Sequence, residues 1–384
     1  MVNLSLLKVK KRKIRMKKLN WKKIIGWGIV VLGLGFVIYF NMKDQKSLQN
    51  SKKRNVYVVL QLTGPIAEAG KHVKTAMDSW IEMHPHASFN LIYVDSESMP
   101  NKAVTGIQQK TLNDDHPITI TAGSIFSNVI LPVMEERDGF NFSIISLNSV
   151  VDGYTNAQNL SYSTEGLMQP IVDEINKRYK SVAVISSFDE NGEQQKNYLV
   201  EHVHPQIKVF KLSLFPNQQD IRLEIIKLLR NKPEVVVILM TPTLVYQNVL
   251  KELRSNFSGT VLTDIVFENK FLNEVVSNSN LKVYTLVDKN ISNNQKLKEF
   301  EKKLLNNNSY LFFVTKQSYD ALDIIDYFIK NDLPFEQDTF AQIGYWAGMS
   351  NITFSGKGES SIKYDLVPFK NKQFIPVESE EKEN

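Results

Sequence analysis

The chain has 384 residues, enough for two lobes with separate cores, and its 42% hydrophobic and 23% charged residues are typical of a folded protein. The formal charge of +5 is misleading, because ten Lys or Arg residues lie between Lys8 and Lys23, and without them 36 basic residues face 41 acidic ones. A mildly acidic body argues against nucleic-acid binding. The lack of cysteine excludes disulfides, thiolate metal sites, a cysteine nucleophile and a lipid-modified cysteine anchor.

A basic segment and an uncharged segment stand at the N-terminus. The basic run within residues 1–23 precedes residues 24–40, "IIGWGIVVLGLGFVIYF", whose length is at the short end of what spans a bilayer. A buried core helix is the alternative, but the basic run favours a membrane signal. We expect a transmembrane signal anchor with a cytoplasmic N-terminus, a linker at 41–54 and a periplasmic or extracellular body. No small-x-small cleavage site follows, which favours an uncleaved anchor, and both Met1 and Met16 fit as its start.

The body begins with a predicted strand, tight loop and helix. Residues 56–62 form a nearly continuous apolar run, as in a strand covered on both faces, and the run breaks at Gly64-Pro65. Five apolar residues then recur at helical spacing: Val73, Ala76, Met77, Trp80 and Ile81. In open α/β sheets ligands bind at the loops that follow the strands, so this loop is a candidate binding loop.

Apolar runs and amphipathic helical patterns alternate along the rest of the body. Nine short apolar runs begin near positions 56, 89, 118, 142, 181, 209, 235, 260 and 282. This alternation predicts parallel sheets with right-handed crossovers. Residues 150–166 lack periodicity and are rich in turn formers, so we interpret them as a connection between two similar halves. Residues 309–331 show a long helical pattern, and strand-like alternation follows around a glycine-rich turn.

The common enzyme signatures are missing from the sequence. It contains no G-x-G-x-x-G after the first strand, no P-loop, no H-E-x-x-H and no G-x-S-x-G. Two His pairs, at 84 and 86 and at 202 and 204, lie beside proline near predicted helix ends, where solvated imidazoles are the commoner role. We therefore predict no catalytic residue, no cofactor and no metal site, and a protein that is not an enzyme.

Polar residues gather where predicted strands end. In "TAGSIFSN" at 121–128 the chain passes from a strand into a helix, with Ser124 at the N-cap or in the first turn. The free N–H groups of a helix start favour an anion by roughly 0.3–1 kcal/mol, so a carboxylate would suit this turn. Ser124 could instead cap its own helix, and the two roles are compatible. Hydroxyls and an amide also end later strands, in "SLNS" at 146–149 and "LMTPT" at 239–243.

Five segments carry a family likeness. "LTGPIAEAG", "YVDSESMPNKAV" and "TAGSIFSNVILPV" come first along the chain, and "QSYDALDIIDYFIKN" and "MSNITFSGKGESSIKYDLVPFKNKQF" follow. In this order they resemble the type I periplasmic solute-binding proteins of ABC transporters, in the leucine/isoleucine/valine-binding branch. The third is similar to the family's ligand-binding Ser turn, the fourth to its late Tyr-Asp-Ala helix and the fifth to its closing hairpin. The likeness covers about residues 55–378.

The resemblance implies an α/β fold of two Rossmann-like lobes that close on a ligand held between carboxyl-end loops. Three hinge crossings would join the lobes, near residues 161–164, 284–289 and 346–348. The implied domains are 55–162 and 288–346 for lobe 1, 163–287 and 347–378 for lobe 2, and 379–384 as a tail.

The resemblance also implies ligand-binding residues in lobe 1. It places a ligand carboxylate on Ser124 and on the loop after the fourth strand, which carries Asn148 and Ser149 here. Thr63 would join them through the first loop.

Lobe 2 matches the family less well. Its implied ligand-binding residues are Thr241 and, for a ligand ammonium, Asp264. A carboxylate opposite an ammonium is a sensible pairing only when both are desolvated together, and Asp264 could instead be a turn residue. Asn191 and Thr241 stand where the family often has aromatic residues. The expected ligand is therefore another small polar molecule, or none, rather than a standard branched-chain amino acid.

Three hypotheses for the function remain open. In the first, a membrane-tethered extracytoplasmic protein captures an amino acid or related polar molecule by lobe closure and delivers it to an ABC permease. In the second, a degenerate member of the family acts at the membrane as a sensor, regulatory module or protein-interaction domain. The third is a hydrolase, which the missing nucleophile and metal motifs disfavour. The sequence leaves open the identity of the ligand, the oligomeric state and the partner.

Overall fold

The computed structural model describes most of the body of the chain. The described residues are 53–64, 67–146, 148–215, 218, 220–240, 244–264, 280–288, 295–309, 313–370 and 373–374. The chain divides into two units, Met1–Lys53 and Arg54–Asn384, and all described residues except Lys53 belong to the second. The predicted transmembrane anchor, the basic segment, most of the linker and the tail lie outside the described residues. None of the described helices is long and apolar enough to cross a membrane.

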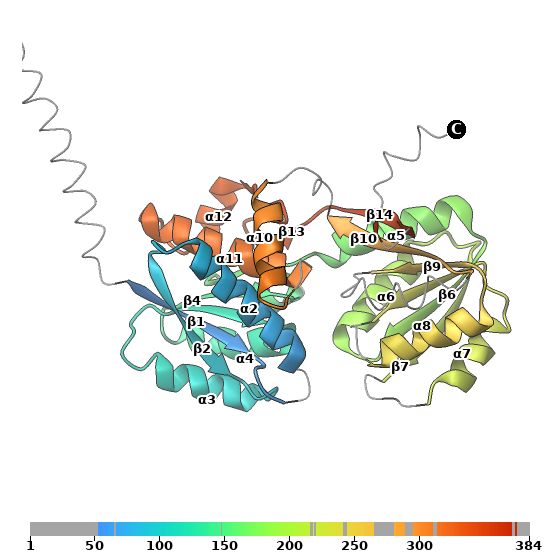
Figure 1. The fold of residues 1–384 in the computed structure, drawn as a ribbon, viewed down its shortest axis with the longest axis horizontal. Coiled ribbons are helices and arrows are strands. Elements are labelled where there is room, and N and C mark those ends of the chain that lie inside the picture. Colours follow the sequence, from blue (N-terminus) through green and yellow to red (C-terminus); the bar gives the residue numbers. More distant parts are fainter. Residues whose placement is uncertain are drawn as a thin grey trace, which may run out of the picture. The chain divides into compact units, whose positions relative to one another are not determined.

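Five parallel strands form the sheet of the first half of the body, which we call lobe 1 (Figure 1). Their order is β2-β1-β3-β4-β5. The strands are β1 (Arg54–Leu60), β2 (Phe89–Asp95), β3 (Ile118–Ala122), β4 (Phe140–Ile144) and β5 (Ala157–Asn159). The connecting helices are α2 (Ala67–Met83), α3 (Pro100–Lys110), α4 (Ser124–Glu135) and the short 3₁₀ helix η1 (Asn148–Val151).

Helices cover both faces of this sheet, as the continuous apolar run of β1 predicts. Val56, Val58 and Leu60 pack in the cluster that contains α2, and Tyr57 and Val59 pack in the cluster that contains α3 and α4. Four residues of the predicted apolar stripe of α2 are fully or almost fully buried: Val73, Ala76, Met77 and Trp80. The prediction of a buried strand followed by an amphipathic helix is therefore confirmed.

Seven strands form the second sheet, which we call lobe 2. Its order is β15-β14-β10-β9-β8-β6-β7. The strands are β6 (Ser181–Ser187), β7 (Lys208–Leu214), β8 (Val235–Leu239), β9 (Thr260–Thr263), β10 (Lys282–Asp288), β14 (Tyr364–Lys370) and β15 (Gln373–Phe374). Strands β6 to β10 are mutually parallel, and β14 and β15 extend the sheet with antiparallel pairs. The helices are α5 (Thr164–Arg178), α6 (Glu190–His202), α7 (Arg222–Leu229) and α8 (Leu244–Asn256).

The chain returns to lobe 1 after β10. Helices α10 (Gln295–Asn306) and α11 (Phe313–Lys330) pack against α2, so late residues complete the cover of the first sheet. Helix α12 (Gln337–Ile343) then precedes a small sheet of β11 (Tyr345–Trp346), β12 (Ile352–Phe354) and β13 (Ser360–Ser361). Phe340 of α12 stacks on Phe328 of α11, with ring centroids 4.6 Å apart, and lies edge-on to Phe354 of β12 at 5.3 Å.

The last crossing between the lobes is expected near residues 346–348, where β11 ends. Strands β12 and β13 follow these residues, and the chain joins the seven-stranded sheet at β14. The segment before β14 is fastened to the chain that leaves β5. Ser360 Oγ donates to Ser161 O at 2.7 Å, and Gln158 Nε2 donates to Gly358 O at 3.0 Å.

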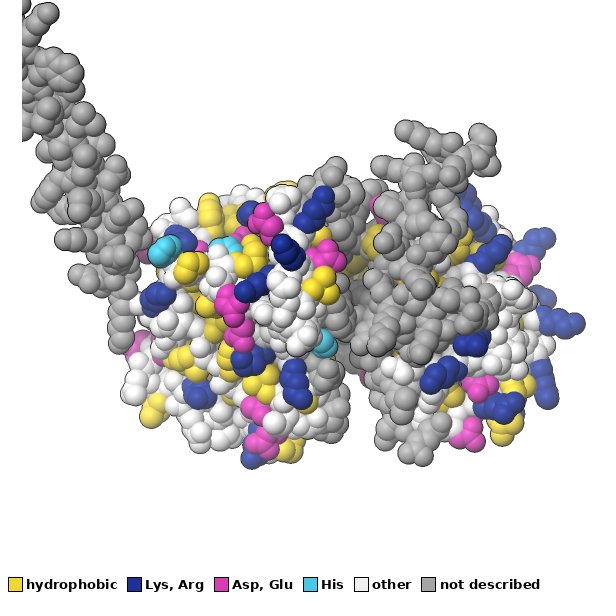
Figure 2. Space-filling view, viewed as in Figure 1, with side chains coloured by type: hydrophobic (Ala, Val, Ile, Leu, Met, Phe, Trp, Pro, Cys, Tyr) yellow, Lys and Arg dark blue, Asp and Glu magenta, His cyan; other side chains and the backbone are white. Residues whose placement is uncertain are grey.

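Charged side chains of both signs share the surface of the body. On the face seen in Figure 2, Lys and Arg side chains lie among Asp and Glu side chains rather than in a single basic field. Among the described residues, no group of three or more His, Asp or Glu side chains is placed to hold a metal ion.

Candidate ligand-binding site

The candidate residues of lobe 1 share one edge of its sheet. Thr63 follows β1, Ser124 follows β3, and Asn148 and Ser149 follow β4. Because β1 pairs with β3, and β3 pairs with β4 in parallel, the loops after these strands are neighbours. The four residues therefore belong to connections at the same edge of the sheet, and their role in ligand binding stays a prediction.

Helix α4 begins at this edge without a side-chain cap. Gly123 is its N-cap residue, with φ of 100° and no side-chain hydrogen bond, and Ser124 is the first helical residue. Gly123 O accepts from the N–H groups of Phe126 and Ser127, both at 3.1 Å. The start of α4 therefore carries no carboxylate of its own on the N-cap residue, and its partial positive charge is suited to an external anion.

A buried hydroxyl network lies beneath the start of α4. Ser127 Oγ is 2.7 Å from Thr121 Oγ1 of β3 and 3.2 Å from Ser146 Oγ in the loop after β4. Asn141 Nδ2 donates to Thr121 Oγ1 at 3.0 Å and to Ser143 Oγ at 2.9 Å. All five side chains are buried, so the network fixes the start of α4 relative to the ends of β3 and β4.

The loop after β4 is held by α11. Ile145 has φ of 58°, which is unusual for a β-branched residue, and its N–H donates to Gln317 Oε1 at 3.1 Å. Gln317 is fully buried, and its Nε2 lies 3.4 Å from Ser161 Oγ between the lobes. The loop next enters η1, where Asn148 is the first residue and Ser149 is exposed.

Thr63 is hydrogen-bonded to Asp95, the last residue of β2, through both its hydroxyl and its backbone N–H. Thr63 Oγ1 donates to Asp95 Oδ2 at 2.8 Å, and the N–H groups of Thr63 and Leu62 donate to Asp95 Oδ1 at 3.2 and 2.9 Å. Partial burial acts to raise the pKa of Asp95, but these bonds and one from Glu97 N outweigh it and hold that pKa below its usual range. Asp95 therefore ties the loops after β1 and β2 together.

In lobe 2, Asp264 lies at the end of β9 near two tyrosines. Asp264 is 6% exposed, and its carbonyl oxygen accepts from Leu286 N at 3.1 Å and Thr285 Oγ1 at 3.0 Å. Burial raises the pKa of the Tyr162 phenol, and the negative charge of Asp264 raises it further. Burial and, to a smaller extent, Asp264 also raise the pKa of Tyr246. The carboxylate thus sits in a low-dielectric setting, where an opposite charge would be bound strongly.

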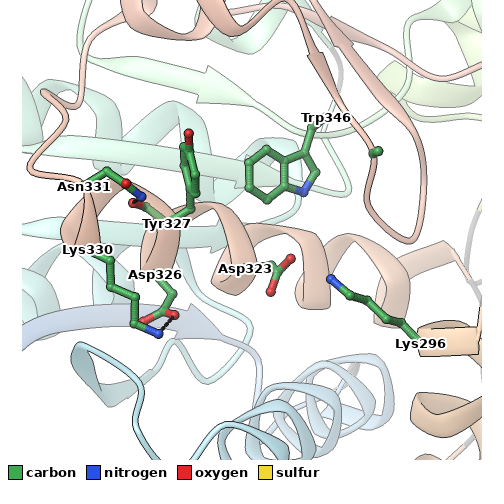
Figure 3. Close-up of a pocket in the computed structure, with 8 residues that line it drawn as sticks. Lys296, Asp323, Asp326, Tyr327, Lys330, Asn331 and Trp346 are labelled. Atoms are coloured by element: carbon green, nitrogen blue, oxygen red, sulfur yellow. Dashed lines mark hydrogen bonds and ion pairs between the residues drawn. The ribbon is translucent and has the colours of Figure 1, made fainter. Parts of the chain in front are cut away.

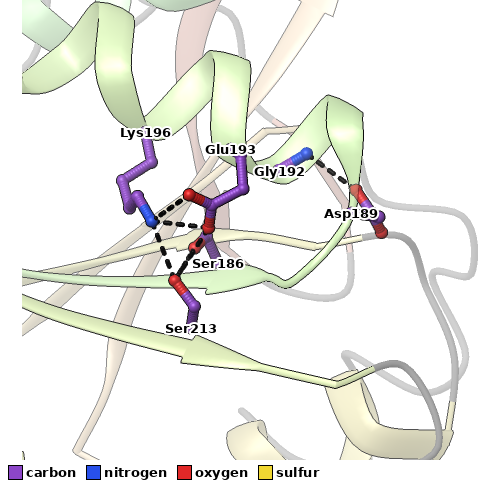
Figure 4. Close-up of polar contacts among 6 residues, drawn as sticks. All are labelled: Ser186, Asp189, Gly192, Glu193, Lys196 and Ser213. Carbon is purple, nitrogen blue, oxygen red and sulfur yellow. Dashed lines mark hydrogen bonds and ion pairs between the residues drawn. The ribbon is translucent and has the colours of Figure 1, made fainter.

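The start of α6 differs from the start of α4 (Figure 4). Asp189 is its N-cap residue, and Oδ1 of Asp189 accepts from Gly192 N at 2.8 Å. Deeper in the helix, Lys196 Nζ donates to Ser213 Oγ at 2.8 Å and to both carboxylate oxygens of Glu193. The hydrogen bond from Lys196 holds the pKa of Glu193 below its usual range. Because Asp189 already places a negative charge at this helix start, α6 is poorly suited to a ligand anion.

Thr241 and Asn191 are the two positions of lobe 2 where the resemblance leads one to expect aromatic residues. Thr241 lies outside the described residues. Asn191 contributes a hydrogen bond to Tyr162, a residue that the sequence did not single out. Tyr162 follows β5 in the aperiodic connection, so no hydrophobic pattern marked it, and only its place between two predicted lobes could have drawn attention to it.

Solved structures share this architecture at low sequence identity. The leucine-binding protein LivK of Thermotoga maritima matches with a TM-score of 0.71 and 16% identity, over 84% of this chain and 97% of that chain. LivJ of Streptococcus pneumoniae in complex with isoleucine matches with a TM-score of 0.71 and 10% identity, over 85% and 98%. A solute-binding protein of an ABC transporter from R. palustris in complex with 4-hydroxybenzoate gives 0.71 and 14%, over 84% and 95%.

The chain has the type I periplasmic-binding fold. Many solved structures with this fold that match are substrate-binding proteins for leucine or branched-chain amino acids. No protein-family model and no curated protein matches the sequence. The sequence-based assignment of two α/β lobes with parallel sheets is therefore confirmed at the level of the fold.

One pocket of this periplasmic-binding fold lies along α11 and is bordered by Trp346 of β11 (Figure 3). It has a volume of about 450 Å³ and includes Asp323, Asp326, Tyr327 and Trp346. Asp326 is ion-paired with Lys330 at 2.6 Å, and the ring of Tyr327 lies edge-on to Trp346 at 5.4 Å. Burial raises the pKa of Asp323. None of the sequence-predicted site residues lines this pocket.

Proposed function

We propose that the protein is an extracytoplasmic solute-binding protein that captures a small carboxylate-bearing ligand, an amino acid or a related polar molecule, for an ABC permease. The observation that carries this proposal is the start of α4, which meets the carboxyl edge of lobe 1 without a side-chain cap. The fold supports it, because solved proteins with this fold include a leucine-binding protein and proteins in complex with isoleucine and with 4-hydroxybenzoate. The predicted anchor at 24–40 would tether the protein to the membrane, with the body outside.

The proposed site combines residues from both lobes. Ser124 and the loop of Asn148 and Ser149 would receive the carboxylate, and Asp264 would face a positive group on the ligand. Thr63 and Thr241 would line the site from the loops after β1 and β8. Binding would shift the population toward a closed form, because only that form gains contacts from both lobes, and no bond of the ligand would be changed.

Ligand-dependent stability tests this function. The full chain in detergent would be heated with a panel of amino acids, amides and small carboxylates at millimolar concentration. A ligand present at 100 times its Kd should stabilise the protein by about 2.7 kcal/mol, which a thermal shift of the unfolding midpoint detects. Native mass spectrometry of the same sample should show a bound small mass. If the whole panel leaves the midpoint unchanged and no small mass is bound, small-molecule capture is refuted.

A second function, a protein-interaction or regulatory module, is favoured by one observation. Two side chains that could meet a ligand are used inside the chain, since Thr63 donates to Asp95 and Asn191 bonds with Tyr162. In that case a protein, and no small molecule, should copurify with the full chain, and the same mass spectrometry experiment separates the two functions.

A further inference from the structure

Two aromatic side chains stand exposed at the carboxyl edge of lobe 2. Phe188 and Phe215 directly follow β6 and β7, and their side chains are 54% and 55% exposed. The ring centroids lie 4.9 Å apart at an interplanar angle of 57°, so the two rings form one aromatic surface. Exposed single apolar residues are common, but a contiguous exposed aromatic pair at a strand edge is informative.

The backbone holds this pair in place. Phe188 N donates to Leu214 O at 2.7 Å, which continues the β6–β7 pairing past the end of the strands. Gln218 N donates to Phe215 O at 3.0 Å, and Gln218 Oε1 accepts from Phe215 N at 3.3 Å. Neither ring belongs to the hydrophobic clusters of the described residues. The rings are thus positioned by the sheet without contributing to its core.

Exposed apolar side chains also lie at the carboxyl ends of the strands in lobe 1. Nine large apolar side chains are exposed among the described residues, and four of them lie within four residues of the carboxyl end of a parallel strand. These four are Met99, Ile125, Phe188 and Phe215. Ile125 directly follows Ser124 in the first turn of α4, so an apolar surface adjoins the start of the helix that suits an anion.

We propose that Phe188 and Phe215 receive the ring of an aromatic carboxylate, so that the ligand class of this site is the aromatic acids. The inference rests on the proposed function and adds the class of ligand to it. A flat ring gains edge-to-face and offset contacts with Phe rings beyond the burial of its area, whereas a saturated ring of the same size gains only the burial. The carboxylate of such a ligand suits the start of α4, where the N-cap residue is a glycine, and the start of α6 beside Phe188, which Asp189 caps, does not compete for it.

Paired probes that differ only in aromaticity test the proposal. Binding of benzoate, cyclohexanecarboxylate and leucine to the full chain in detergent would be measured by calorimetry. Benzoate should bind about threefold to tenfold more tightly than cyclohexanecarboxylate, and leucine should bind more weakly than benzoate. Phe188→Ala and Phe215→Ala should each lose roughly threefold to tenfold of the benzoate affinity. Tyr345→Ala removes an aromatic ring that is 51% exposed on β11 and should leave the affinity unchanged.

Each outcome bears on a different proposal. Cyclohexanecarboxylate or leucine binding as tightly as benzoate would overturn the aromatic class and leave solute capture intact. The same conclusion would follow if both Phe variants bound benzoate like the unaltered chain, or if Tyr345→Ala lost as much affinity as they did. If neither these three probes nor the wider panel binds, solute capture itself fails. The substituted side chains are exposed and outside the core, so the variants are expected to fold, and their unfolding midpoints report whether they do.

Discussion

Ser124 is the first helical residue of α4, so a charge introduced at this position tests whether the start of the helix receives a ligand anion. Ser124→Asp would place a carboxylate in the first turn of α4, which stabilises a helix by about 0.3–1 kcal/mol. The same charge would repel a ligand carboxylate, by up to about 4 kcal/mol at 4 Å and an effective dielectric of 20. We expect stability to stay level or rise while the affinity for the best carboxylate of the panel falls at least tenfold, measured by thermal unfolding and calorimetry.

The matched control lies one turn further along α4. Asn128 is exposed there, and Asn128→Asp adds the same charge at a greater distance from the helix start. Its affinity should change by less than about threefold. Equal losses in both variants would show that the effect is the overall charge of the lobe, and unchanged binding in Ser124→Asp would remove the start of α4 from the site.

Asp95 makes stability depend on pH in a defined direction. Its pKa is lowered in the folded protein, so its stabilising effect is full above its unfolded-state pKa of about 3.9 and is lost as pH falls through the lower folded value. Asp95→Asn should cost about 1–2 kcal/mol at pH 7, since hydrogen bonds to a charged group are replaced by weaker ones. The difference between the two proteins should shrink below about pH 4, as urea unfolding at several pH values would show.

Asp115→Asn provides the comparison for this pH series, because Asp115 is exposed on the loop before β3. It should change the free energy of unfolding by no more than about 0.5 kcal/mol at any pH. A cost for Asp95→Asn that stays constant between pH 7 and pH 3 would contradict the assignment of the effect to the carboxylate charge.

At the scale of elements, the first strand–helix unit of each lobe, β1–α2 and β6–α6, brings a glycine of the helix close to the backbone at the end of the strand. Gly70 of α2 faces the carbonyl oxygen of Gln61, and Gly192 of α6 faces that of Ser187, each so closely that a Cβ would collide with backbone. Gly70→Ala should therefore destabilise the protein by about 1–3 kcal/mol, as overpacking does in tight contacts. Lys71→Ala, at the exposed next position, should change stability by less than about 0.5 kcal/mol. Equal urea midpoints for the two variants would show that α2 can move away from β1.

Elements with strong periodicity could be predicted from the sequence. The run at 235 became β8, with five fully buried residues, and the helical pattern at 309–331 became α11. β5 was missed, because its residues Ala157, Gln158 and Asn159 are short or polar and are buried through hydrogen bonds with residues near Gly358. A hydrogen-bond partner 200 positions away leaves no local pattern in the sequence.

The sequence allowed the candidate site residues to be assigned to strand ends, but it did not allow their hydrogen-bond partners to be predicted. The sequence placed Ser124 at a helix start and Asp264 after a strand, and both positions agree with α4 and β9. That Thr63 donates to Asp95, and that Gln317 reaches the loop after β4, depends on side chains brought together by separate strands and helices. The binding roles of these residues stay predictions until a ligand is found.

At the scale of the whole molecule, segments distant in sequence meet where the chain passes between its lobes. Gln317 of α11 bonds with Ile145 and approaches Ser161, and Ser360 donates to the carbonyl of Ser161. The loop of the proposed site is therefore connected through the buried Gln317 amide to the segment that follows β5. A change in the angle between the lobes could alter the position of this loop through Gln317 alone, because that one side chain contacts both the loop and Ser161.

Because α10 and α11 pack on the first lobe, that lobe cannot complete its folding until late in synthesis of the chain. At about 5–20 residues per second, a ribosome completes α11 roughly 9–34 seconds after β5. Throughout that interval the surface of α2 that contacts α10 and α11 is uncovered, and the nascent chain is vulnerable to aggregation or proteolysis. A polypeptide terminated before α11 would leave apolar surface of the first lobe exposed, and it would lack β14 and β15 at one side of the second sheet. Both lobes are therefore complete only after residues 313–374 have been made.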